Sequence, residues 1–127
     1  DPNTAMKCLD FAGVLLGKIS TVEGCYNCSK TEDSRLAVIY ESFNLKKDLE
    51  DSLNQIVFYG KEDLFVVSAV MDALLSSYHQ ATKENKEIIR DYSNYVYDRT
   101  IDNFQHERER KIIDSRYELL NFKENQV

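Results

Sequence analysis

The chain has 127 residues, of which 43% are hydrophobic and 30% are charged, and its formal net charge is −6. This length and composition indicate one globular domain, 1–127, and exclude a largely disordered chain. The acidic balance disfavours nucleic-acid binding, and the longest apolar run, Phe11 to Leu16, is far shorter than the ~20 residues of a membrane span. We expect residues 1–5 to be flexible or left over from cloning.

The positions of glycine and proline predict the fold class. All four glycines and the single proline lie within the first 60 residues, so the stretch 61–127 contains neither. These residues are the strongest breakers of regular structure. The sequence therefore predicts an all-α fold, a single-domain bundle of five or six helices with a central apolar helix at about 62–80.

A first helix is predicted over 4–22, where apolar residues recur every three or four positions. Gly13 and Gly17 lie four residues apart on a neighbouring face of this helix. In a globular protein such spacing indicates the close approach of another helix.

A second helix is predicted over about 29–43, because Ser29 and Glu32 have the spacing of a capping box. Asn44 either caps a third helix or marks a bend within one long helix, and Gly60 is the expected stop. Periodic apolar residues between these two positions favour helix throughout.

The second half of the chain predicts the central helix and its partners. Apolar side chains nearly encircle 64–78, so this helix should be buried on most sides. The polar stretch 82–85 predicts a turn, after which another helix begins. Apolar spacing loosens over 106–111, where either one helix continues through solvent or a break separates two helices.

The chain has three cysteines, Cys8, Cys25 and Cys28, and an odd number cannot all pair within one chain. A continuous first helix would keep Cys8 and Cys25 too far apart for a disulfide. The remaining pair, Cys25 and Cys28, is a possible local disulfide or thiol pair, and a small metal-binding or redox protein centred on it is one alternative function. The odd count favours the cytoplasm, with the periplasm or secretion as the alternative.

Motifs of known catalytic sites are missing from the sequence. It contains neither H-E-x-x-H nor Glu-x-x-His, and neither a glycine-rich phosphate loop nor a nucleophile elbow. His106 follows Asp102 by four residues, for which we expect a surface ion pair. We therefore expect a protein that is no enzyme and that uses no cofactor and no metal.

The best candidate binding surface is acidic and rich in tyrosine: Asp91, Tyr92, Tyr95, Tyr97 and Asp98. On a helix Tyr92 and Tyr95 share a face, whereas Tyr97 lies ~160° away from Tyr95. One of these tyrosines should therefore be exposed or at an interface. Alternatively, Tyr97 packs on a neighbouring helix with its hydroxyl in water.

These observations favour a non-catalytic protein–protein interaction module, such as an inhibitor, an immunity protein or a regulatory adaptor. It would bind another protein, a basic one in particular, through the acidic, tyrosine-bearing face. A structural subunit that self-associates through its C-terminal helices as a homo-oligomer is a further alternative. Acidic and basic residues alternate over 107–118, which is typical of a solvated face rather than a nucleic-acid site.

Overall fold

The computed structural model describes residues 44–122 in full, the backbone of 26–30 and 37–41, and residues 7, 9, 10 and 13. Its elements in chain order are β1 (Tyr26–Lys30), β2 (Ala37–Glu41), α2 (Leu45–Gly60), α3 (Leu64–Gln80), α4 (Lys83–Thr100), the 3-10 helix η1 (Ile101–Asn103) and α5 (Glu107–Asn121). Residues 44–122 are all-α, with four α-helices and no strand within that range.

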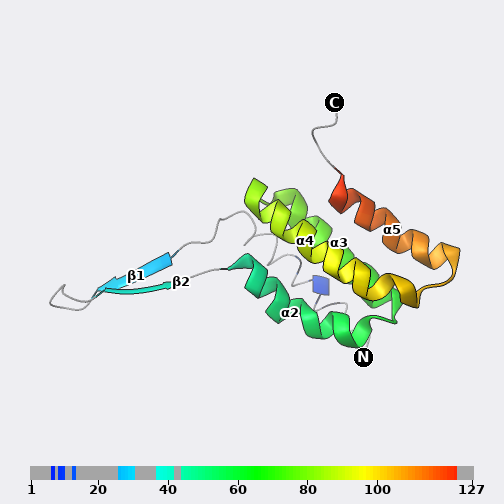
Figure 1. Cartoon of the computed structure of the whole chain (residues 1–127), viewed down its shortest axis with the longest axis horizontal. Coiled ribbons are helices and arrows are strands. Elements are labelled where there is room, and N and C mark those ends of the chain that lie inside the picture. Colours follow the sequence, from blue (N-terminus) through cyan, green and yellow to red (C-terminus); the bar gives the residue numbers. More distant parts are fainter. Residues whose placement is uncertain are drawn as a thin grey trace.

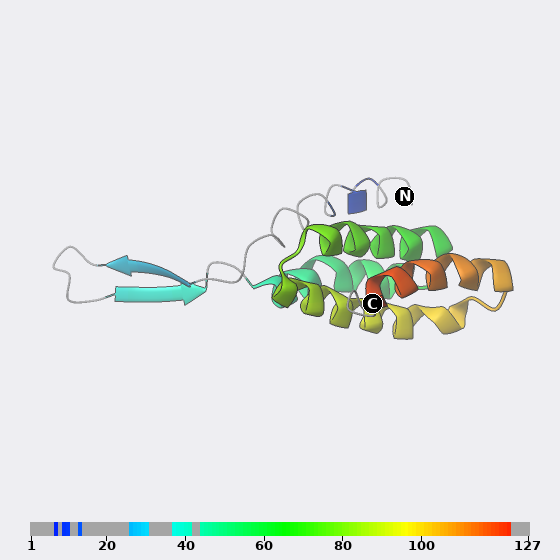
Figure 2. The same cartoon turned by 90° about the horizontal axis from the view of Figure 1, so that it is seen from above.

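The four helices form a bundle (Figures 1 and 2). The apolar helix predicted at about 62–80 is present as α3, which packs against α2, α4 and α5. α4 also packs against the three other helices, so α3 and α4 share the centre of the bundle. The buried core includes Leu49 and Leu53 of α2, Met71 and Leu74 of α3, and Ile89 of α4.

A side chain caps the start of each of the four helices. Asn44 accepts a hydrogen bond from the backbone N–H of Lys47 at 3.0 Å, which confirms that it caps α2. Asp63, Thr82 and His106 cap α3, α4 and α5 in the same way. Residues 82–85, predicted as a turn, are therefore the cap and the first turn of α4. Because α4 and α5 are separate helices, the predicted alternative of a break between two C-terminal helices is confirmed.

The helix predicted over 29–43 is wrong. Residues 26–30 and 37–41 pair as the antiparallel strands β1 and β2, with Lys30 opposite Ala37. Figures 1 and 2 show this ribbon beyond the end of the bundle at which α2 begins. The capping-box spacing was misleading because β2 contains Val38 and Ile39, whose branched side chains favour extended backbone.

Most of the helix predicted over 4–22 lies outside the described residues, as does Gly17. Residues 7, 9, 10 and 13 are helical, and Leu9 is fully buried in the core of the bundle. A Cβ atom added to Gly13 would lie 3.2 Å from the Cβ atom of Ala73 on α3. The close approach predicted at Gly13 is therefore confirmed.

Gly60 ends α2, as predicted, but for another physical reason. The capping residue that follows, Lys61, has right-handed backbone with φ of −59°, so the ending uses no left-handed residue there. A Cβ atom at Gly60 would instead overlap Cγ1 of Val66. Glycine allows the first turn of α3 to fold back tightly against the end of α2.

We expect Gly60→Ala to lower the free energy of unfolding by about 1–3 kcal/mol, because the new methyl group overlaps a buried, branched side chain. Urea denaturation measures this change. Adding Val66→Ala should recover part of the loss, whereas Gln55→Ala, at an exposed position of α2, should change stability by less than ~0.5 kcal/mol. An unchanged or higher stability of Gly60→Ala would contradict the close approach.

Candidate functional site

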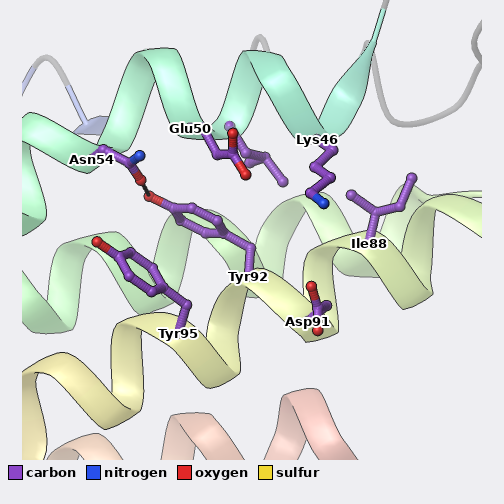
Figure 3. A pocket seen from close by; sticks show the side chains of 8 residues that line it. Lys46, Glu50, Asn54, Ile88, Asp91, Tyr92 and Tyr95 are labelled. Carbon is purple, nitrogen blue, oxygen red and sulfur yellow. Dashed lines mark hydrogen bonds between the residues drawn. The ribbon is translucent and has the colours of Figure 1, made fainter.

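A pocket of about 310 Å³ lies between α2 and α4 (Figure 3). Three of the five predicted surface residues, Asp91, Tyr92 and Tyr95, line it together. The full lining is Lys46, Leu49, Glu50 and Asn54 from α2, and Ile88, Asp91, Tyr92 and Tyr95 from α4.

Helical periodicity explains why these side chains meet. Residues spaced three or four apart project from the same side of a helix, and the lining residues of both helices have this spacing. Because α2 packs directly against α4, the two rows face each other across the pocket.

Tyr92 forms the floor of the pocket and joins its two walls. Its side chain is 7% exposed, and its hydroxyl donates a hydrogen bond to Oδ1 of Asn54 at 2.7 Å. Burial raises the pKa of the Tyr92 hydroxyl well above its usual range, and the charges of Tyr95 and Glu50 raise that pKa further. The hydroxyl therefore stays neutral and connects α4 to α2.

The rim of the pocket is aromatic on one side and charged on the other. Tyr95 is 39% exposed, and its ring centroid lies 5.5 Å from that of Tyr92, with the rings tilted by 45°. Glu50, Asp91 and Lys46 are exposed. Figure 3 shows Lys46 pointing from α2 towards α4, and the three charges leave the rim with an excess of one negative charge.

Tyr97 lies on the other side of α4, against α5. Its hydroxyl donates to Oδ1 of Asp114 at 2.7 Å, and its ring stacks on Tyr117 with centroids 4.0 Å apart. The alternative that Tyr97 packs on a neighbouring helix is confirmed, although its hydroxyl is bonded to a carboxylate rather than to water. The structure thus separates Tyr97 from Tyr92 and Tyr95, while Asp98 is exposed on α4.

The α2 wall of the pocket was missed by the sequence analysis. Lys46, Glu50 and Asn54 have i, i+4 spacing on one side of α2, which is the signal that could have grouped them. Nothing in that spacing identifies α4 as the helix opposite, because the pairing of helices is a property of the tertiary fold.

The described part of the chain gives little support to the other candidate sites. Cys8 and Cys25 lie outside it, and only the backbone of Cys28, in β1, is described. His106 accepts the backbone N–H of Arg108 through Nδ1 at 3.2 Å, so it caps α5 rather than pairing with Asp102. Within the described residues there is no group of three or more His, Cys, Asp or Glu side chains that could hold a metal ion.

Exposed apolar side chains form two further surfaces. At the turn between α2 and α3, Phe58, Tyr59 and Phe65 are 53%, 83% and 69% exposed, a set that we call the aromatic turn. Phe58 and Tyr59 contact edge to face at 5.1 Å. On α5 and just beyond it, Leu119 and Phe122 are 56% and 65% exposed, and self-association through this helix stays a prediction.

We expect the Tyr97 hydroxyl to stabilise the bundle only below its folded-state pKa. The hydrogen bond to Asp114, with burial as the second cause, raises the pKa of Tyr97 from 10.0 to about 12. A raised phenol pKa means that the stabilisation is complete below pH 10 and is lost as the pH rises from about 10 to 12.

Urea denaturation of the wild type and of Tyr97→Phe across this pH range measures the effect. The wild type should be more stable by about 0.5–1.5 kcal/mol at pH 8, and the difference should shrink above pH 10. Tyr59→Phe, at an 83% exposed ring, is the control and should show no such trend. A difference that is constant with pH would contradict the role of this hydrogen bond.

Within the part of the chain that the structure describes, no helix has the length and apolar character needed to cross a bilayer. No curated protein and no solved structure matches the chain. Residues 1–76 match the model of one family, whose description reads "Predicted membrane protein (DUF2254)". Because this match covers more than half of the 127 residues, the chain belongs to the DUF2254 family.

Proposed function

We propose that this protein is a non-catalytic interaction module that binds a partner protein through the α2–α4 face. The observation that carries the proposal is the pocket, which is lined by the 39% exposed ring of Tyr95 together with Asp91 and Glu50. Partly exposed tyrosines beside a cavity are frequent anchor points in protein interfaces. An inhibitor, an immunity protein or a regulatory adaptor would use such a face, and its acidic rim favours a basic partner.

The rigidity of this face supports the proposal. Leu49 is fully buried below it, and the hydrogen bond from Tyr92 to Asn54 connects its two walls. A surface that is already ordered loses less conformational entropy on binding than a flexible one. The pocket can therefore contribute binding energy without a refolding step.

Affinity capture from the native source tests this function. The double variant Asp91→Lys, Tyr95→Ala should reduce recovery of the partner by at least about tenfold, since it reverses one charge and removes one anchor ring. The matched control is Asp102→Lys, Leu119→Ala, which makes the same kinds of change at exposed positions away from the pocket. Equal loss in both variants, or in neither, would contradict binding through this face.

A second candidate function is contact with a membrane surface, and the aromatic turn favours it. The family is described as a predicted membrane protein, and the match to it includes Phe58, Tyr59 and Phe65. Aromatic rings with a nearby lysine are typical of membrane–water interfaces, and Nζ of Lys61 lies 5.3 Å from the ring centroid of Phe58.

Sedimentation with phosphatidylcholine vesicles tests the second candidate. These vesicles have no net charge, which avoids repulsion of a chain whose net charge is −6. Tyr59→Ser with Phe65→Ser should reduce bound protein by about tenfold, because two exposed rings no longer insert. The control Leu119→Ser, Phe122→Ser removes apolar surface from the C-terminal side and should bind as the wild type does. No binding by the wild type would exclude this function.

A further inference from the structure

We infer that the pocket between α2 and α4 receives an arginine side chain of the partner, an inference that rests on the protein-binding function proposed above. The pocket has an apolar floor, an aromatic face and two carboxylates at its rim. These three features match the methylene stem, the planar guanidinium and the positive charge of arginine.

The floor of the pocket suits the stem of a long side chain. Leu49 is fully buried and Tyr92 is 7% exposed, so the floor is a closed apolar surface. Because the Tyr92 hydroxyl is bonded to Asn54, its ring is held in one position. Methylene groups that lie on this floor would leave water without burying an unpaired hydroxyl, because the Tyr92 hydroxyl is already bonded to Asn54.

The rim supplies the contacts for the guanidinium. The Tyr95 ring is 39% exposed, so part of it is open to a planar cation, and stacking of arginine on tyrosine is favourable. Glu50 from α2 and Asp91 from α4 bring a carboxylate to each wall. A carboxylate binds the paired N–H groups of arginine with two parallel hydrogen bonds, which an ammonium group cannot match.

Lys46 brings a positive charge of the chain itself to this site. Its side chain lines the same pocket and points from α2 towards α4 in Figure 3. In Figure 3 this amine lies near Ile88, at the other end of the pocket from Tyr95, so it adds a positive charge to the rim without covering the Tyr95 ring. It would compete with the guanidinium for the two carboxylates, so the charge of Lys46 should weaken binding.

This competition makes the test sharp, because substitutions on the same rim should act in opposite directions. The full-length protein is titrated with N-acetyl-arginine amide, and binding is followed by NMR shifts of the backbone amides around Tyr92 and Tyr95. Asp91→Asn and Glu50→Gln should each weaken binding by about threefold to tenfold, and Lys46→Gln should tighten it by a similar factor. N-acetyl-citrulline amide, which is neutral and of the same shape, should shift these signals at least about fivefold less.

Several results would overturn the inference. Equal shifts with the arginine and citrulline amides would show that charge is not recognised. Weaker binding in Lys46→Gln together with tighter binding in Asp91→Asn would show that the rim carboxylates do not bind the guanidinium. No shift near Tyr95 with arginine amide, while Asp91→Lys, Tyr95→Ala still abolishes partner capture, would reject the arginine site and leave the protein-binding function standing.

Discussion

The fold depends on burying α3, whose side chains are apolar around most of the helix. Met71 and Leu74 are fully buried, and Val67, on another side of α3, is only 2% exposed. One neighbouring helix covers only one stripe of such a surface, so α3 needs α2, α4 and α5 around it. These three helices are amphipathic, with apolar faces that meet α3 and polar faces that meet water. The loss of apolar surface from water around α3 is the main contribution that holds them in place.

The position of α4 in this arrangement requires polar contacts as well. Arg90 donates through Nε to the carbonyl of Leu120 at 3.1 Å and through Nη2 to the hydroxyl of Tyr78 at 2.6 Å. One side chain of α4 therefore fixes the end of α5 and the end of α3. On α5, Arg116 contacts both carboxylate oxygens of Asp72 on α3, at 2.6 and 3.3 Å. Such directional bonds fix the relative position of helices that apolar burial alone would leave free to slide.

Periodicity and capping predicted most of the bundle from the sequence, since both are local. They located α3, the cap at Asn44 and the shared face of Tyr92 and Tyr95. They failed over 29–43, where a local capping pattern competes with branched residues that pair across a ribbon. The reason for glycine at position 60 was equally hidden, because Val66 approaches it only in the folded chain. For the same reason the α2 wall of the pocket could not be derived, as it depends on which helix faces α4.

The tyrosines of α4 divide between packing within the bundle and the partner recognition that we propose. The hydroxyl of Tyr97 donates a hydrogen bond to Asp114 of α5, and the hydroxyl of Tyr92 donates one to Asn54 of α2. These bonds act in opposite directions from α4 and hold it between its two neighbours. Tyr95 lies one helical turn beyond Tyr92, where the gap between α2 and α4 opens to solvent. The Tyr95 ring therefore contacts the buried ring of Tyr92 and is partly exposed to solvent. An ordered but accessible ring of this kind suits the binding surface that we propose.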